Sequence, residues 1–152
     1  MEFKTVVCNL GNELYGVDIN LVQGIEKEQE VVRIPNSASY IKGIMNLRGD
    51  IIPIYSLRRK FGIADDPSIK PQFIIVRIGD MPLAIEVDGV GEIFEADEST
   101  VFETPKIVIS SDTQYISKVV NAKGKLILII DINKLLTENE KPGIEDLIDS
   151  CK

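Results

Sequence analysis

The chain has 152 residues, a length that suits one domain with a sizeable core. Its residues are 44% hydrophobic and 27% charged, an apolar fraction too high for a disordered chain. The formal net charge of −7 argues against nucleic acid as a partner, because phosphate binding needs clustered lysine and arginine. The longest unbroken apolar run, residues 126–130, is far shorter than the ~20 residues that span a bilayer, and the N-terminus lacks a signal peptide. We therefore expect a soluble cytoplasmic protein that does not insert into the membrane.

The sequence lacks the side chains that most catalytic and metal sites use. No histidine is present, which excludes a Ser-His-Asp triad and histidine-ligated zinc. The two cysteines, Cys8 and Cys151, are too few for a thiolate zinc site and are expected to be reduced thiols. Gly89-Val90-Gly91 matches half of a dinucleotide-binding fingerprint, but Phe94 replaces the third glycine, so a tight turn is the better interpretation. We expect no catalytic residue, no cofactor and no metal.

The first half of the chain has the pattern of short strands joined by glycine turns. Apolar residues alternate with others over residues 14–19, which is the period of a half-buried strand. Gly11-Asn12 and Gly49 are placed as hairpin turns between such runs. Pro53 lacks an amide donor, which places its strand at a sheet edge or a bulge. Ser56 is a candidate N-cap for a short helix.

The second half shows the same succession of signals. Apolar residues alternate with others over residues 83–88. Gly79-Asp80 and Gly124 are placed as turns, and Asp131 is a second candidate N-cap. Beyond these, an amphipathic pattern predicts a C-terminal helix at about residues 143–151, with one apolar face formed by Ile144, Leu147, Ile148 and Cys151.

The two halves are an internal repeat. An offset of 68 residues places Tyr15 on Leu83 and Val22 on Val90, and keeps a glycine at 11 and 79. A later offset of 75 places Asn46-Leu47-Arg48-Gly49 on Asn121-Ala122-Lys123-Gly124. Because a repeat dictates architecture, we predict two similar subdomains, residues 3–62 and 71–137. The many short strands favour two small, mainly antiparallel barrels packed together.

Charged residues outside this pattern are interpreted as surface features. Asp18, Glu86 and Asp88 are spaced as outward-facing strand residues, and a catalytic carboxylate pair would need two of them in one pocket. The basic cluster Arg58-Arg59-Lys60 is expected to be a solvated face.

The most specific motif of the chain lies at residues 40–54. It includes Asn46-Leu47-Arg48-Gly49 and closely resembles the CheW family of chemotaxis coupling proteins. Further matches are residues 15–19 with Val22-Gln23, residues 57–61 and residues 87–90, and the resemblance extends over residues 3–136. It implies a mainly β fold of two SH3-like five-stranded barrels around a shared hydrophobic core, in agreement with the repeat.

The resemblance implies an adaptor without catalytic activity. Proteins of this family bridge the cytoplasmic tips of methyl-accepting chemoreceptors and the histidine kinase CheA, which ends in a CheW-like regulatory domain. We therefore expect these two partners, recruitment to receptor arrays at the inner face of the cell membrane, and a monomer when the protein is alone. About 15 residues follow the second barrel, too few for a kinase or receiver domain, so a stand-alone coupling protein is expected.

The resemblance also assigns a receptor surface, an apolar groove at the junction of the two barrels. Val22, Gly43 and Arg48 match family residues implicated in receptor coupling, and Val90 and Ile93 lie on the second barrel's share of the groove. Each has a structural alternative that stays open. Both valines and Ile93 are candidates for barrel core, Gly43 for a strand or bulge glycine, and Arg48 for a solvated hairpin cation. The repeat places Lys118 opposite Gly43, so barrel geometry does not itself demand glycine there.

Two kinase contacts follow from the resemblance. Ile19, Lys42, Ile44 and Ile52 are candidates for the main contact with CheA. A second contact, which closes rings of alternating kinase and coupling protein, would use Phe102, Pro105 and Ile107. The chain departs from the family at Phe102, where a basic residue is frequent, and at Gly24, where an acidic residue is frequent. The ring chemistry and a salt bridge at position 24 therefore do not follow from the resemblance.

Other functional classes fit the sequence less well. An SH3-like module for proline-rich peptides needs an aromatic-lined groove, whereas aromatic residues make up 6% of the chain and tryptophan is absent. An oligonucleotide-binding barrel needs stacking aromatics beside a basic track, which the acidic charge opposes. The alternatives that we retain are a stand-alone β-barrel peptide-binding module and a scaffold of a related signalling array outside chemotaxis.

Overall fold

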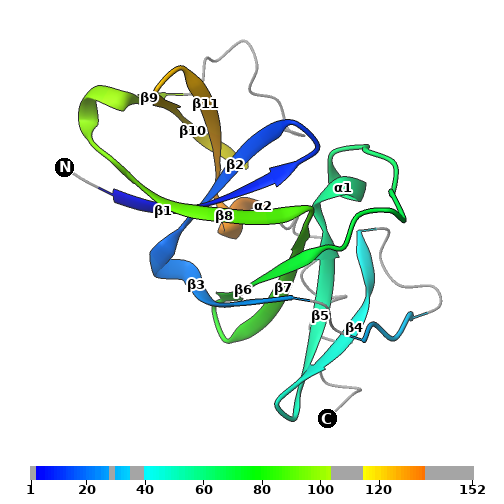
Figure 1. Ribbon diagram of the computed structural model, residues 1–152. Helices are drawn as coiled ribbons and strands as arrows, with labels where there is room; N and C mark the ends of the chain where they lie inside the picture. Colours follow the sequence, from blue (N-terminus) through cyan, green and yellow to red (C-terminus); the bar gives the residue numbers. More distant parts are fainter. Residues whose placement is uncertain (1–2, 28–29, 35–39, 104–114, 136–152) are drawn as a thin grey trace.

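A computed structural model describes residues 3–27, 30–34, 40–103 and 115–135 of the protein (Figure 1). The predicted fold class is confirmed, because the chain is mainly β, forms two sheets, and has short helices. Within the described residues no helix is long and apolar enough to cross a membrane. The predicted C-terminal helix at 143–151, with Cys151, lies outside the described residues.

Eleven strands form the two sheets within the described part of the chain. Sheet A has the order β8 (Gly89–Ala96), β1 (Phe3–Leu10), β2 (Glu13–Asp18), β11 (Lys125–Ile130), β10 (Ile116–Ala122) and β9 (Val101–Glu103). Sheet B has the order β3 (Val22–Glu26), β6 (Gln72–Ile78), β7 (Met81–Val87), β5 (Asp50–Ser56) and β4 (Ile41–Leu47). The short helices are η1 (Ile19–Leu21), α1 (Leu57–Lys60), η2 (Glu98–Thr100) and α2 (Ile132–Leu135).

The strand order corrects the predicted subdomain boundaries. Residues 3–62 and 71–137 repeat the same succession of strands, with β9 matched in the first half only by the bridge of Val32, but each sheet combines strands from both ranges. The hairpin β1–β2 of the first half lies in sheet A beside β8 and β11, and the hairpin β6–β7 of the second half lies in sheet B beside β3 and β5. Two parallel pairings, β2 with β11 and β5 with β7, join the halves, whereas the remaining ladders are antiparallel. The halves have exchanged their first hairpins, so neither half forms a sheet of its own.

The repeated glycines make repeated turns. Gly11 and Gly79 have φ angles of 59° and 61° and begin the two-residue turns of β1–β2 and β6–β7. A positive φ at the first turn position is the type II′ geometry that matches the twist of a hairpin, and glycine adopts it without strain.

The Asn-x-[Arg/Lys]-Gly motif is explained by a second turn type. Arg48 and Gly49 form the two-residue turn between β4 and β5 with φ angles of 53° and 92°, and Lys123-Gly124 repeats this between β10 and β11. Positive φ at both central residues defines type I′. The Gly49 amide donates to Asn46 Oδ1 at 2.9 Å, and the Gly124 amide donates to Asn121 Oδ1 at 2.8 Å. The asparagine therefore stabilises the turn that holds the cation.

The predicted helix caps are present. The Arg59 amide donates to the Ser56 hydroxyl at 3.3 Å at the start of α1, and the Asn133 amide donates to Asp131 Oδ1 at 3.0 Å at the start of α2. Of the two alternatives for Pro53, the sheet edge is wrong, because β5 lies between β7 and β4. The ladder between β4 and β5 does have a register shift opposite Ile54 and Tyr55, next to Pro53. Pro53 pairs with Ile44, and the ladder to β7 begins only at the next residue, Ile54, so the missing amide breaks no pairing to β7.

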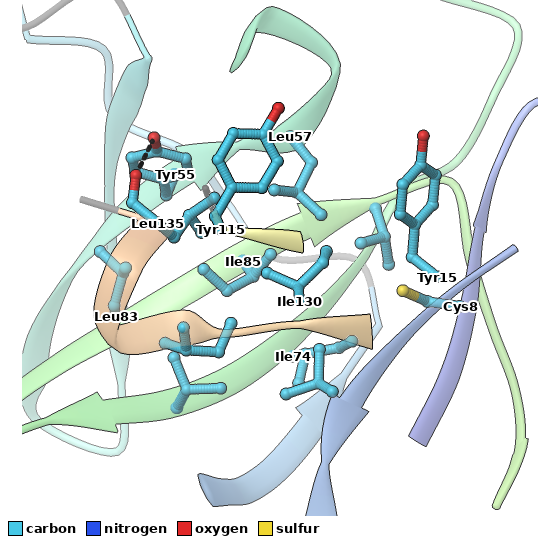
Figure 2. Close-up of a cluster of buried hydrophobic side chains, with 14 of the residues drawn as sticks. Cys8, Tyr15, Tyr55, Leu57, Ile74, Leu83, Ile85, Tyr115, Ile130 and Leu135 are labelled. Atoms are coloured by element: carbon cyan, nitrogen blue, oxygen red, sulfur yellow. Dashed lines mark hydrogen bonds between the residues drawn. The ribbon is translucent and has the colours of Figure 1, made fainter. Parts of the chain in front are cut away.

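The buried side chains form three clusters, one between the two sheets and one inside each barrel. The central cluster lies between the sheets and takes side chains from both of them (Figure 2). Its members include Cys8, Leu10, Tyr15 and Val17 of sheet A, Ile74, Val76, Leu83 and Ile85 of sheet B, and Leu57, Ile132 and Leu135 of the two α-helices. The other two clusters fill the interior of each barrel and are related by the repeat, since Ile52, Ile54 and Met45 in sheet B correspond to Ile127, Ile129 and Val120 in sheet A.

The exchange of hairpins predicts that neither half folds alone. We expect fragments 1–66 and 67–152, cut in the exposed linker, to lack native β structure separately, because each would expose the unpaired edges that the other half fills. Mixed together, they should recover the circular dichroism spectrum and the cooperative melting of the intact chain. A cooperative melt of fragment 1–66 by itself would contradict the exchange.

Candidate protein-interaction surfaces

The end strands of the two sheets, β3 and β8, present equivalent apolar residues. Val22 of β3 and Val90 of β8 are half-buried and both pack against the central cluster. Further along the same strands, Ile25 and Ile93 are exposed at 43% and 54%. The structure thus brings Val22 and Val90 to one cluster and leaves two isoleucines outside it. We call these four residues the junction surface.

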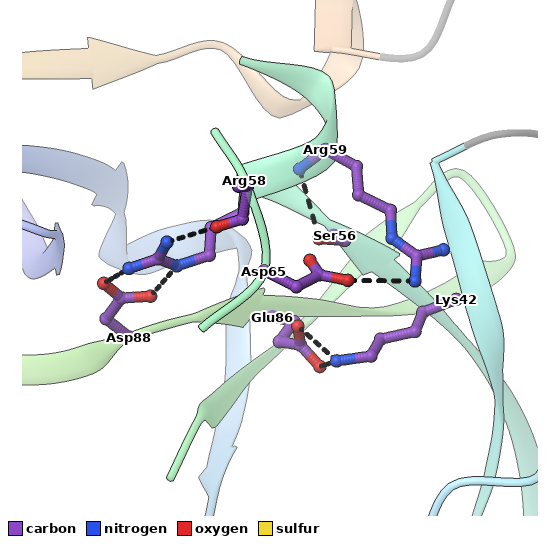
Figure 3. Close-up of polar contacts among 8 residues, drawn as sticks. Lys42, Ser56, Arg58, Arg59, Asp65, Glu86 and Asp88 are labelled. Carbon is purple, nitrogen blue, oxygen red and sulfur yellow. Dashed lines mark hydrogen bonds and ion pairs between the residues drawn. The ribbon is translucent and has the colours of Figure 1, made fainter. Parts of the chain in front are cut away.

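Polar contacts fix β8 to sheet B and to α1. The Val90 amide donates to Gln72 Oε1 of β6 at 2.7 Å. Just before β8, the Asp88 carboxylate accepts two hydrogen bonds of 2.6 Å from Nε and Nη2 of Arg58 (Figure 3). It accepts a third, of 2.7 Å, from the Gly11 amide. The side chains of Arg58 and Asp88 are only 13% and 7% exposed. Burial raises the pKa of Asp88, but the hydrogen bonds from Arg58 and Gly11 together lower it by more. The pKa of Asp88 therefore lies below its usual value.

Arg48 has a partner that the sequence did not reveal. Its Nη2 lies 3.3 Å from Oε1 of Glu26 on β3, so the ion pair connects the β4–β5 turn with the opposite end strand of sheet B. The Arg48 side chain is 82% exposed, so the pair contributes at most about 1 kcal/mol to stability. Glu26 lies two residues after Gly24, on the same face of the strand. The acidic partner of Arg48 on β3 is therefore Glu26 rather than residue 24.

Gly43 is buried beneath the chain's own backbone. A Cβ atom at Gly43 would overlap the carbonyl oxygen of Val32, which pairs with Ile44 through two hydrogen bonds of 2.9 Å. The close approach of the Val32 backbone, rather than the barrel geometry, is therefore what demands glycine at this position. The second half makes the equivalent pairing of β9 with β10 and accepts Lys118 at the position of Gly43.

The residues predicted for the main kinase contact are scattered. Lys42 Nζ lies 3.1 Å from both carboxylate oxygens of Glu86, so it has an internal partner (Figure 3). Ile19 packs against the central cluster, and Ile44 lies half-buried on β4, an end strand of sheet B. Ile52 is 3% exposed inside the sheet B barrel and is a wall residue of a groove rather than a surface contact.

That groove is an open depression of about 840 Å³ at the turn end of sheet B. Its walls are β3, the β4–β5 hairpin and the β6–β7 hairpin, and its apolar residues include Ile52, Ile75 and Met81. Arg48, Glu26 and Asp80 stand among its polar residues. The groove is therefore lined by Arg48, a predicted receptor residue, and by Ile52, a predicted kinase residue.

A second exposed pair lies on the outer edges of the sheets. Phe102 is 53% exposed on β9, the last strand of sheet A, and Val32 is 54% exposed beside β4 in sheet B. Both residues pair with equivalent positions of the repeat, Val119 and Ile44. Pro105 and Ile107, predicted to act with Phe102, lie outside the described residues.

Several charged residues that were predicted to be solvated have partners within the protein. In the basic cluster, Arg58 pairs with Asp88, Arg59 lies 3.2 Å from Asp65, and Lys60 Nζ lies 4.7 Å from the ring centroid of Tyr40. Glu86 is also buried, at 6% exposure. The pairs of Asp88 with Arg58 and of Glu86 with Lys42 join residues distant in sequence, which strand spacing alone does not predict.

The thiol of Cys8 is placed for packing rather than chemistry. Its side chain lies in the central cluster at 1% exposure. Burial, with a smaller contribution from Asp88, raises the pKa of the Cys8 thiol to about 12, so the thiolate nucleophile does not form at neutral pH.

The two halves of the chain exchange hairpins to form two sheets, and the end strands of these sheets carry exposed apolar residues. This arrangement is that of a protein-binding scaffold, and comparisons with known proteins agree with that class. The CheW-like domain model matches residues 4–140, and the chain belongs to this family. It is 31% identical over 151 residues to the chemotaxis protein CheW of Treponema pallidum, covering 96% of this chain and 89% of that protein. The crystal structure of the scaffolding protein TtCheW from Thermoanaerobacter tengcongensis matches with a TM-score of 0.82 and 34% identity, covering 92% of this chain and 96% of that one. The chain also aligns with 14% of the chemotaxis protein CheA of Borreliella burgdorferi at 29% identity, covering 82% of this chain.

The contact at Gly43 predicts a steric effect with a matched control. Gly43→Ala should lower the free energy of unfolding by roughly 1–3 kcal/mol, because the added methyl must displace the Val32 backbone. Gly24→Ala, in the same sheet, should be nearly neutral because no heavy atom lies within 4 Å of the added carbon. Urea denaturation of both variants measures the difference. Equal stabilities would show that the Val32 segment does not rest on Gly43.

Proposed function

We propose that this protein is a non-catalytic adaptor that couples methyl-accepting chemoreceptors to the histidine kinase CheA. The observation that supports this most strongly is the match to the CheW-like domain over nearly the whole chain, at the level of both sequence and fold. An adaptor of this kind needs apolar surface for partners rather than reactive groups. The junction surface and the outer-edge residues Val32 and Phe102 supply such surface, since large apolar side chains on end strands are typical of interaction sites.

The junction surface is our candidate for the receptor site. Val22 and Val90 would form its half-buried floor and Ile93 its exposed rim, next to end strands that are open to a partner. The tip of a receptor is a helical hairpin, and helices commonly bind by placing apolar side chains into such a surface. Arg48, which is 82% exposed, would add a charged contact at the turn end of sheet B. Gly43 would act indirectly in this scheme, by holding the Val32 segment in place.

The outer edges are our candidates for kinase contacts. Ile44 with Val32 on sheet B would make the main contact, with Lys42 and Ile52 of the β4–β5 hairpin beside them. Ile19 would contribute separately, because it lies in η1 next to β3. Phe102 on sheet A would make the second contact, with Pro105 and Ile107. The two edges are related by the repeat, and a CheA protein aligns with this chain over a segment of its length. A CheW-like domain in the kinase would carry equivalent edges, so related modules would pack edge to edge on either side of the adaptor.

Separate surfaces would allow both partners to bind at once. β3 and β8 lie at one end of their sheets, while β4 and β9 lie at the other end. An adaptor with this arrangement would be held beneath the membrane through the receptors, at the inner face of the cell membrane, and would bring CheA to the same place.

Binding to receptor should depend on Ile93 but not on another exposed residue of the same sheet. Ile93→Lys should weaken binding to a receptor cytoplasmic fragment by about tenfold or more, because it places a charge in an apolar contact. Leu126→Lys is the matched control, since Leu126 is 60% exposed on β11, three strands away from β8. Both side chains are exposed, so both melting temperatures should stay close to that of the wild type.

Co-sedimentation with receptor fragments, and separately with CheA, measures these affinities. We expect Ile93→Lys to lose the receptor and keep the kinase, and Leu126→Lys to keep the receptor. Undiminished receptor binding by Ile93→Lys would place the receptor site elsewhere. Wild-type protein that binds neither partner would overturn the proposed function.

A further inference from the structure

The chain passes from sheet B to sheet A at Asp88, between β7 and β8, and three elements hold this residue. Arg58 of α1 donates two hydrogen bonds of 2.6 Å to its carboxylate, and the Gly11 amide in the β1–β2 turn donates one of 2.7 Å. The Asp88 amide itself donates to the Asn9 carbonyl at 3.0 Å. Because α1 is joined to sheet B and Gly11 to sheet A, the carboxylate connects the two sheets at the crossing point.

Arg58 extends the same connection to the linker. Its third donor, Nη1, binds the Ala64 carbonyl at 2.7 Å, so one guanidinium joins the crossing point to the segment between the two halves. The planar fork of arginine makes these directed contacts simultaneously, which the single ammonium of a lysine does not reproduce. Hydrogen bonding to Asp88 raises the pKa of Arg58, although burial opposes it, so the pair is charged at neutral pH.

The crossing point lies two residues before Val90. The Val90 amide binds Gln72 Oε1 of sheet B, so the first residues of β8 are fixed from both sheets. The position of β8 along the junction sets where Val90 and Ile93 lie relative to Val22 and Ile25. A shift of the crossing point would therefore change the spacing of the junction surface.

The internal repeat shows that the fold does not need this connection. The equivalent crossing, from β2 to β3, has Asn20 in the place of Asp88, and Asn133 stands in the place of Arg58. Neither carries a charge, so that crossing is built without an ion pair. There the Asn20 amide donates to the Asp18 carboxylate at 2.9 Å, which only caps η1 locally. The barrel architecture thus forms at one crossing without the contact that the other one has.

We infer that Asp88, held by Arg58 and Gly11, is a positioning residue that sets the spacing of the junction surface for its receptor. This inference rests on the proposed function, because it concerns the same surface. Asp88 does not touch the partner itself. It acts through the start of β8.

The test compares variants of this ion pair with a matched ion pair on the same helix. Asp88→Asn removes the charge and keeps the shape, and Arg58→Lys keeps the charge and removes the fork. Because breaking a buried pair also destabilises a protein, the binding of every variant is measured at a temperature at which circular dichroism shows it to be folded. Asp65→Asn is the control, since Asp65 pairs with the neighbouring Arg59 in a more exposed position, with side chains 47% and 33% exposed.

The readouts are the dissociation constants for a receptor cytoplasmic fragment and for the regulatory domain of CheA. We expect Asp88→Asn and Arg58→Lys to weaken receptor binding by about tenfold, the effect of a loss of ~1.4 kcal/mol, and to leave kinase binding unchanged. The amide resonances of Val90 and Ile93 should move in the free variants, while Asp65→Asn should change neither affinity. If folded Asp88→Asn binds the receptor with wild-type affinity, the inference is overturned but the proposed function is not. Parallel loss of both partners would also overturn the inference, since it would show a merely structural role. Failure of the wild type to bind receptor would overturn the proposed function as well.

Discussion

The exchange of hairpins between the two halves of the chain is the constraint on which the rest of the structure depends. Because β1–β2 completes sheet A and β6–β7 completes sheet B, side chains of both halves meet in the central cluster, which includes Val17, Ile74 and Ile85. The same arrangement leaves β3 and β8 as end strands next to that cluster. A pair of independent barrels joined by a linker would have placed these strands without any fixed relation.

Much of this architecture was predictable from the sequence because its signals are local. The turns at Gly11 and Gly49 and the cap at Ser56 depend on neighbouring residues, and the repeat ensures that each appears twice. The exchange was not predictable, since a hairpin has the same sequence pattern whichever sheet it joins. The strands predicted at residues 14–19 and 83–88 correspond closely to β2 and β7, while the assignment of residues 3–62 and 71–137 to separate barrels was wrong, since each sheet combines strands from both ranges.

In the candidate site, too, local features were predictable from the sequence and long-range contacts were not. Its apolar residues were found through the family resemblance and the repeat, but their surroundings depend on contacts distant in sequence. Asp88 was interpreted as solvated because its spacing is that of an outward-facing residue, and only the approach of Arg58 and Gly11 buries it. The need for glycine at position 43 comes from the backbone of Val32 above it, and nothing near Gly43 in sequence reveals that contact. The repeat gives the two halves equivalent strands, and contacts such as these, which occur in one half only, make the halves different.

The central claim is that receptor and kinase bind different ends of the same two sheets. Amide chemical shifts of the isotope-labelled protein, recorded during titration first with a receptor cytoplasmic fragment and then with the CheA regulatory domain, test it most directly. The account predicts that receptor perturbs β3 and β8, including Val22 and Val90, whereas the kinase perturbs β4 and β9 without displacing the receptor. Perturbation of the same strands by both partners, with competition between them, would contradict it.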